Sequence, residues 1–338
     1  MFRAGSVLLM AAACTLAACH AARPSSVPTA AVSADSVPPG LREGAHEVVA
    51  NGVRLWYRVA GSAPADAPPV VFLHGGPGQG SQSFAALAGP HLEPRLRMVY
   101  FDQRGSGRSE RPWTGEYALE TLVEDVEGLR RALGVQRIAI IGQSFGGVLA
   151  LEYAAKYPRH VSRMVIAAGL SDTPGSIRAQ CARLGEVHPD AYARVMDEAR
   201  RNGSEVCNVF QALPDSLRGE FFQANMYPVP TTRDLVERAD TAGGLRNTGE
   251  IGGYLFSHGL MEWRFSGHER LTMPVLVIAG ERDYQIGLHP QRELASRLPD
   301  GQLLVYEGAG HFMYVDQPER FARDVAAFFN VDASTGRR

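Results

Sequence analysis

The sequence predicts an α/β protein: a doubly wound, mostly parallel β-sheet with an inserted helical cap. Short continuous apolar runs, typical of strands buried on both faces, alternate with segments of helical periodicity. This alternation stops between about residues 171 and 270, where the sequence is more polar and helical. The 338 residues, of which 45% are hydrophobic, suffice for one large core with such an insertion.

The predicted core begins with a β-hairpin. Two strand-like runs within residues 46–61 surround Asn51-Gly52, a dipeptide favoured in two-residue hairpin turns because both positions tolerate positive φ. Further strand-like runs lie at 68–76, 95–105, 136–142, 161–169, 273–280 and 302–308, and helix-like segments at 118–134, 145–158, 291–299 and 318–329. We therefore expect residues 45–170 and 271–332 to form the core, and residues 171–270 to form the cap.

The N-terminus has the pattern of an export signal. Residues 1–18 contain one basic residue, Arg3, followed by an apolar stretch that ends in small residues. This stretch is shorter than the roughly 20 residues that a membrane-spanning helix needs, and no other segment approaches that length, so we expect no transmembrane helix. Residues 16–19 also resemble a bacterial lipobox, which implies lipidation of Cys19. The alternative is a soluble secreted protein.

A lipid anchor at Cys19 would determine where the protein lies. The next residue is His20; an aspartate there would, by resemblance, favour retention at the inner membrane. We therefore expect an envelope protein that faces the periplasm at the outer membrane. Residues 19–44, rich in Ala, Pro, Ser and Val, predict a flexible tether. A coil of this length spans roughly 25–30 Å, which keeps the core near the membrane without embedding it.

Lipidation predicts the effect of Cys19→Ala on cell fractionation. The variant should move from the membrane fraction to the soluble fraction, because the cysteine thiol is the group that receives the lipid. Immunoblotting of both fractions measures this change. Unchanged fractionation would exclude the anchor.

Two cysteines remain for the folded domain. Of the four, Cys14 leaves with the signal and Cys19 is the lipidation candidate, so Cys181 and Cys207 are left. An exported protein folds in a compartment that permits disulfides. We favour a Cys181–Cys207 disulfide over two buried free thiols.

The charge distribution limits the possible partners. The formal net charge is −2, and the sequence contains no basic stripe or long block of like charges. Nucleic-acid binding therefore has little support. We expect a small-molecule or short-peptide substrate, and contact with a membrane only through Cys19.

Residues 142–146 match the pattern G-x-S-x-G, with Ser144 between Gly142 and Gly146. The pattern lies where a predicted strand passes into a predicted helix, which is the setting of a nucleophile elbow. Small flanking residues allow the sharp turn that exposes the serine hydroxyl. The alternative is a phosphate-binding loop, but the lysine of a Walker motif and a G-x-G-x-x-G pattern are both absent here.

A nucleophilic serine needs a base and an acid that orients it. In this arrangement the chain order is serine, acid, histidine. Asp283 and His311 fit, because each follows a predicted strand at the edge where open α/β sheets place their sites. Glu281 is a rival acid, and His289 and His258 are rival bases.

An oxyanion hole is predicted beside the elbow. Residues 72–78, "FLHGGPG", follow an early strand, and glycines let backbone N–H groups approach a substrate oxygen. We assign the N–H groups of Phe145 and Gly76, with Gly75 as the alternative to Gly76. A serine mechanism of this kind needs no metal or organic cofactor.

These motifs resemble the α/β-hydrolase family, and within it the proline iminopeptidase branch of serine exopeptidases. The motifs are "HGGPG", "DQRGSGRS", "GQSFGG", "GERD" and "GAGH", and the resemblance covers about residues 45–330. It implies the doubly wound sheet, the helical cap and the removal of N-terminal residues from short peptides. Asp102 and Arg104 are interpreted as residues that organise a loop.

The resemblance also implies a cap carboxylate that binds the substrate's α-amine, because a buried cation needs such a partner. Glu250 and Tyr254 are our candidates for substrate binding. The other cap acids considered are Glu186, Glu205, Glu237 and Glu262, and the aromatic residues that line a pocket or form core are Phe221, Phe222, Tyr227, Tyr254 and Phe256.

Three functions therefore remain open at this point. The first is an aminopeptidase of the proline iminopeptidase type. The second is an esterase or lactonase that uses the same triad on a non-peptide carbonyl. The third, a non-catalytic receptor on a hydrolase fold, is disfavoured by the intact triad and oxyanion loop.

Overall fold

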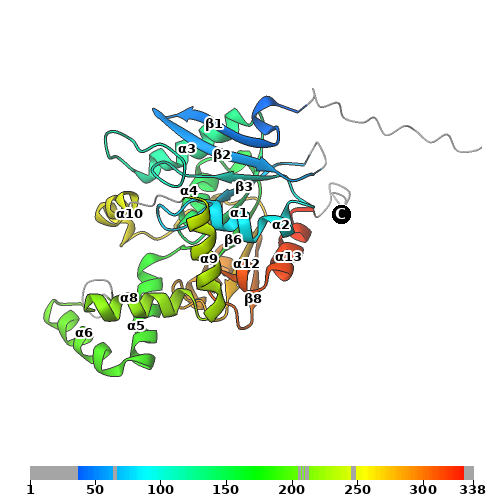
Figure 1. The fold of residues 1–338 in the computed structure, drawn as a ribbon. Helices are drawn as coiled ribbons and strands as arrows, with labels where there is room; N and C mark the ends of the chain where they lie inside the picture. The colour runs from blue at the N-terminus through cyan, green and yellow to red at the C-terminus, as the bar shows by residue number, and fades with distance from the viewer. Residues whose placement is uncertain are drawn as a thin grey trace, which may run out of the picture.

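The computed structural model describes residues 37–63, 67–204, 207, 209, 213–244 and 249–330 (Figure 1). The predicted signal, Cys19 and most of the predicted tether lie outside these residues. Within the described ranges, no helix is both long enough and apolar enough to cross a membrane.

The centre of the protein is an eight-stranded sheet with the order β1-β2-β4-β3-β5-β6-β7-β8. β1 and β2 pair antiparallel, β2 pairs antiparallel with β4, and all the other pairs are parallel. The predicted α/β fold is confirmed. The strands are β1 Gly44–Ala50, β2 Val53–Ala60, β3 Val70–Leu73, β4 Met98–Phe101, β5 Ile138–Gln143, β6 Val161–Ala167, β7 Val275–Gly280 and β8 Gly301–Tyr306.

The hairpin predicted at Asn51-Gly52 joins β1 to β2. Both turn residues have positive φ, 47° for Asn51 and 79° for Gly52. An asparagine and a glycine adopt this conformation at little cost, which explains the choice of residues. The hairpin is thus a local feature that the dipeptide alone specifies.

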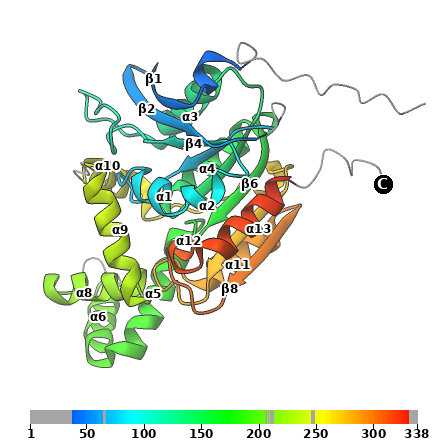
Figure 2. The same cartoon turned by 45° about the vertical axis from the view of Figure 1, so that its right-hand side comes forward.

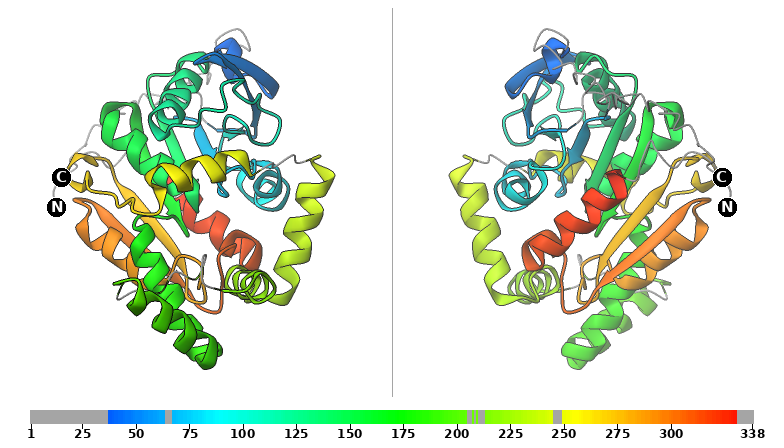
Figure 3. Two further views of the ribbon diagram at one scale, coloured as in Figure 1. Left: turned by 90° about the vertical axis from the view of Figure 1, so that its left-hand side faces the viewer. Right: turned by 90° about the vertical axis from the view of Figure 1, so that its right-hand side faces the viewer.

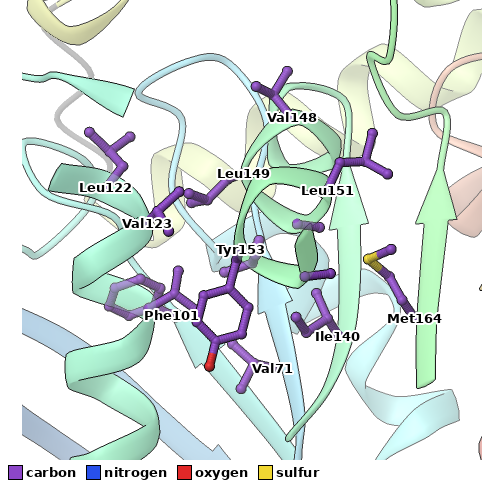
Figure 4. Close-up of a cluster of buried hydrophobic side chains, with 14 of the residues drawn as sticks. Val71, Phe101, Leu122, Val123, Ile140, Val148, Leu149, Leu151, Tyr153 and Met164 are labelled. Atoms are coloured by element: carbon purple, nitrogen blue, oxygen red, sulfur yellow. The ribbon is translucent and has the colours of Figure 1, made fainter. Parts of the chain in front are cut away.

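Helices cover both faces of the sheet (Figures 1 and 2). Successive residues of β3 alternate between the two cores: Val71 belongs to the core that includes residues of α3, α4 and α11, whereas Phe72 belongs to the core that includes residues of α1, α2, α12 and α13. Figure 4 shows the first core, where Val71, Ile140 and Tyr153 lie together. The core helices are α1 Gln82–Leu87, α2 Gly89–Leu92, α3 Leu119–Ala132, α4 Phe145–Lys156, α11 Leu288–Arg297, α12 Met313–Asp316 and α13 Pro318–Asn330.

The cap is inserted between β6 and β7, and its two ends meet. Asp172 and Arg264 form an antiparallel bridge, and Phe265 N–H donates to the carbonyl of Ser171 over 2.9 Å. α5 and α6 extend away from the sheet (Figure 3). The cap helices are α5 Thr173–Val187, α6 Pro189–Arg201, α8 Asp215–Met226, α9 Pro230–Ala242 and α10 Glu250–Leu255, and a π turn follows α10 at Phe256–Leu260. Short 3₁₀ turns lie in the core at Pro39–Leu41 and Pro158–His160, and at the end of the cap at His268–Arg270.

A disulfide joins Cys181 on α5 to Cys207, with the two Cα atoms 6.0 Å apart. The pairing favoured from the sequence is therefore confirmed. Both residues belong to a small apolar cluster of their own within the cap, together with Leu184 and Phe221. This cluster gives the outer part of the cap its own core, which the disulfide reinforces.

Candidate active site

Ser144 lies in a strained turn between β5 and α4. Its φ and ψ are 54° and −122°, a conformation that L-residues rarely adopt. A Cβ added to Gly146 would lie 2.0 Å from the carbonyl oxygen of Leu73, and one added to Gly142 would lie 2.6 Å from that of Gly146. The glycines are therefore required because α4 approaches β3 and β5 too closely for any side chain.

Asp283 and His311 meet at the same edge of the sheet, beyond the ends of β7 and β8. The Nδ1 atom of His311 lies 3.2 Å from both carboxylate oxygens of Asp283. Both side chains are buried, with exposures of 2% and 1%. Oδ1 of Asp283 also accepts the N–H groups of Gln285 and Ile286, each over 3.1 Å. This geometry places carboxylate oxygens as acceptors opposite Nδ1–H, which leaves the lone pair of His311 on Nε2.

The rival residues have other roles. Glu281 accepts the N–H of Gly308 over 2.9 Å and so organises the turn before His311. His289 is solvent-exposed and lies 3.9 Å from Glu293. His258 stacks on Tyr254, with ring centroids 3.9 Å apart. Of the candidate acids and bases, only Asp283 and His311 contact each other among the described residues.

Gln143 is a residue near the triad that sequence reasoning missed. Its Nε2 atom lies 3.3 Å from Nε2 of His311. Among the described residues, Ser144 Oγ makes no hydrogen bond to His311. Gln143 occupies a variable position of the G-x-S-x-G pattern, so the motif carries no signal for it.

The predicted oxyanion loop packs directly on the elbow. A Cβ added to Gly75 would lie 2.8 Å from Cβ of Ser144, and Gly76 has a φ of 113°. Gly75 contacts the elbow, and Gly76, whose N–H is the predicted oxyanion donor, is the next residue in the chain. Gly75 and Gly76 are both placed where only glycine fits.

The ring of His74 forms hydrogen bonds that hold the oxyanion loop in place. Gln103 N–H donates to Nε2 of His74 over 3.0 Å, so Nδ1 carries the proton and donates to the carbonyl of Gly75 over 2.9 Å. Burial lowers the pKa of His74, which keeps its ring neutral. The neutral tautomer is what lets one ring accept and donate at once.

Asp102 and Arg104 organise the neighbouring loop, as predicted. Asp102 accepts from the N–H and the hydroxyl of Ser81 over 2.8 and 2.6 Å, and from the N–H and Nε of Arg108 over 2.9 and 2.8 Å. Arg104 makes a buried bidentate pair with Asp125 on α3, at 2.5 and 2.7 Å. Both carboxylates are therefore used in holding this loop.

The cap contacts the loop that carries His311. A Cβ added to Gly310 would lie 2.5 Å from Pro228, which joins α8 to α9. Tyr227 stacks on Phe312, with ring centroids 4.9 Å apart, and Phe312 packs edge-on against His311 at 5.2 Å. Asp316 accepts the N–H of Gly310 over 2.7 Å and the hydroxyl of Thr232 on α9. α9 is thereby fixed to the histidine loop.

Glu250 and Tyr254, the residues predicted to bind the substrate, both lie on α10. Their described contacts are with neighbouring side chains and not with the triad. Glu250 is half exposed, accepts the hydroxyl of Tyr117 over 3.1 Å and lies 3.9 Å from Arg111. Tyr254 packs between His258 and Tyr117. A cation and a hydroxyl already serve the Glu250 carboxylate, and no described contact links it to Ser144.

The other cap acids proposed from the sequence are unsuited to a buried cation. Glu186, Glu237 and Glu262 are not buried, and the first two pair with Arg183 and Arg233. Glu205 lies outside the described residues. Of the aromatic residues, Phe221 and Phe222 belong to the cap core, Tyr227 contacts Phe312, and Phe256 is 39% exposed.

Asp240 on α9 is a cap carboxylate that sequence reasoning missed. Its Oδ2 accepts from Nε2 of Gln79, just beyond the oxyanion loop, over 3.1 Å. Its Oδ1 is buried without a well-formed hydrogen bond, although Ser83 lies close enough to lower the pKa. Burial outweighs these contacts and raises the pKa of Asp240. Burial and the nearby Asp240 carboxylate raise the pKa of Tyr227 to about 12.

The part of the chain that the structure describes contains no cluster of potential metal ligands. There, no group of three His, Cys, Asp or Glu side chains lies close enough to hold an ion.

Sequence comparison agrees with this architecture. Residues 68–318 match the family described as the alpha/beta hydrolase fold. Because the match spans most of the chain, the chain belongs to the α/β-hydrolase family, and its fold and relatives are those of a hydrolase.

Individual relatives include hydrolases with different substrates. A proline iminopeptidase of Pestalotiopsis fici is 29% identical over 283 residues, which cover 81% of this chain and 95% of that protein. A 2-hydroxymuconate semialdehyde hydrolase of Pseudomonas putida is 30% identical over 275 residues, which cover 77% and 86%. The crystal structure of a proline iminopeptidase-related protein from Thermus thermophilus has a TM-score of 0.68 at 28% identity, covering 86% of this chain and 98% of that one. The chain thus resembles hydrolases of both peptide and non-peptide substrates.

Proposed function

We propose that the protein is a serine hydrolase, most closely an aminopeptidase of the proline iminopeptidase type that releases N-terminal residues from short peptides. The observation that carries the proposal is the buried Asp283–His311 pair together with Ser144 in a strained elbow, whose preceding residue, Gln143, contacts His311. The relatives named proline iminopeptidase support the peptide substrate.

The mechanism follows from the positions of the groups. His311, oriented by Asp283, takes the proton of Ser144 Oγ, and the oxygen attacks the substrate carbonyl. The N–H groups of Phe145 and Gly76 stabilise the oxyanion, a contribution worth about 10²–10³ in rate for each donor. His311 then protonates the leaving amine, and water releases the acyl group from Ser144.

Asp240 is the cap residue we assign to the substrate's α-amine. Its buried Oδ1 lacks a well-formed partner, and a buried carboxylate whose pKa is raised gains most from an added cation. Its contact with Gln79 places it beside the loop that carries the oxyanion donors. Glu250 remains the competing assignment from the sequence.

The second candidate function is an esterase or lactonase-type hydrolase with the same triad. The similarity to a semialdehyde hydrolase of Pseudomonas putida favours it. In that case Asp240 serves only to dock α9 on α1 through Gln79 and Ser83. A non-catalytic receptor would leave Ser144, Asp283 and His311 without a use.

A substrate panel distinguishes these functions. We expect the highest kcat/KM for Pro-naphthylamide among Pro-, Ala- and Leu-naphthylamides, and no hydrolysis of N-acetyl-Pro-naphthylamide, which lacks the cationic amine. Short acyl p-nitrophenyl esters are measured in parallel. Hydrolysis of the esters alone would refute the aminopeptidase proposal, and hydrolysis of neither would favour the receptor.

Replacement of Asp240 by asparagine tests the amine site. Loss of a charged hydrogen bond should lower kcat/KM for Pro-naphthylamide about 10–100-fold, mainly through KM, and leave ester hydrolysis unchanged. Glu250→Gln is the matched control and should change neither rate appreciably. The opposite result, a loss in Glu250→Gln alone, would assign the amine to Glu250.

From residues 1–19 we further infer that the enzyme is anchored in the cell envelope. The lipobox-like residues 16–19 support this location, and the Cys19→Ala fractionation tests it.

A further inference from the structure

The side chain of Gln143 bridges the histidine and the oxyanion loop. It is 2% exposed, and its Nε2 atom lies 3.3 Å from Nε2 of His311. A Cβ added to Gly75 would lie 2.7 Å from Oε1 of Gln143, so the amide oxygen contacts the loop backbone. The amide is thus held between the two groups that the proposed reaction uses.

The contact between the two nitrogen atoms has only one consistent protonation. Nδ1 of His311 faces both oxygens of Asp283 at 3.2 Å and must donate to them. Nε2 of a neutral ring then has a lone pair and no hydrogen. The amide of Gln143 therefore donates to the same lone pair that has to accept the proton of Ser144.

We propose that Gln143 is a positioning residue that occupies the Nε2 lone pair of His311 in the free enzyme and yields it to Ser144 when substrate binds. This inference rests on the proposed serine-hydrolase function. It gives the amide a specific effect: a donor at Nε2 is compatible with neutral imidazole and repels imidazolium. Gln143 therefore opposes protonation of His311.

The carboxylates around His311 favour the protonated ring, which is the opposite of the effect of Gln143. Asp283 contacts Nδ1. Burial raises the pKa of Asp316 on α12, and its hydrogen bonds and the nearby charges of Arg282 and His311 partly offset this effect. On the cap side, the neutral Tyr227 covers Phe312 beside the ring. With two carboxylates favouring imidazolium, Gln143 is the described contact of Nε2 that disfavours it.

The test measures the rate at which a small fluorophosphonate labels Ser144, as a function of pH. This probe reacts with the activated serine and needs no knowledge of the natural substrate. Gln143→Met removes the donor at similar volume and should shift the acidic limb of the labelling rate upward by about 0.5–1 pH unit. Gln143→Glu, which places an acceptor there, should shift the limb further in the same direction.

The control is Gln317→Glu, because the side chain of Gln317 bonds only to the carbonyl of Glu307 and to Arg320 within the described contacts. Its pH profile should match the wild type. A rate loss in Gln143→Met that is equal at every pH would show a structural role and overturn the proposal, as would an unmoved limb. Thermal unfolding checks that each variant folds. Failure of the wild-type enzyme to label would instead overturn the proposed function.

Discussion

Replacement of Ser144 by alanine should reduce hydrolysis about 10⁵–10⁶-fold, because the attacking atom is lost and the rest of the triad then has no role. The fold should tolerate the change. Alanine keeps the Cβ that already sits at a φ of 54°, and Ser144 Oγ makes no hydrogen bond among the described residues. The measurement is kcat with the best substrate of the naphthylamide and ester panel, together with the melting temperature.

Ser162→Ala provides the matched control for this variant. Its hydroxyl donates to the carbonyl of Ile138 over 3.1 Å, at the opposite end of β5 from the elbow. Its activity should stay near that of the wild type. More than about 1% residual activity in Ser144→Ala, measured in protein free of host hydrolases, would exclude Ser144 as the nucleophile.

The sequence predicted the parts of the site that parallel-sheet geometry fixes. Ser144, Asp283 and His311 follow β5, β7 and β8, which end at one edge of the sheet. Their strand-end positions therefore predicted one common edge for all three without any knowledge of side-chain packing, and at that edge Asp283 and His311 are in contact. The hairpin at Asn51-Gly52 was equally readable, because two residues decide it locally.

The cap could not be read in the same way. The sequence favoured Glu250, which the structure places half exposed beside Arg111. It did not single out Asp240, because the face that α9 turns toward α1 depends on tertiary contacts such as that with Gln79. A helix pattern gives the spacing of its residues but does not say which neighbour covers them. Gln143 was hidden for a related reason: its importance comes from where His311 lies, 168 residues later.

Replacement of Asp283 by asparagine should lower kcat about 10⁴-fold, although it removes no group that touches the substrate. The reason lies in the hydrogen bonds of this carboxylate. Oδ1 accepts the N–H groups of Gln285 and Ile286, so the oxygen of an asparagine must stay at that position. Its NH₂ group is then forced into the position of Oδ2, which lies 3.2 Å from Nδ1 of His311, as far as the retained oxygen does.

The NH₂ group repels Nδ1–H, because both are donors, whereas it can donate to Nδ1 when the ring hydrogen is on Nε2. The substitution therefore favours the tautomer with the hydrogen on Nε2, in which Nε2 cannot accept the proton of Ser144. The kcat of Asp283→Asn is measured beside that of Glu281→Gln, the rival acid, which holds only the Gly308 N–H among its described side-chain contacts and should retain most activity. A loss below about tenfold in Asp283→Asn would mean that this carboxylate does not set the tautomer. Such a result would contradict the proposed triad, because Asp283 is the acid that contacts Nδ1 of His311 among the described residues.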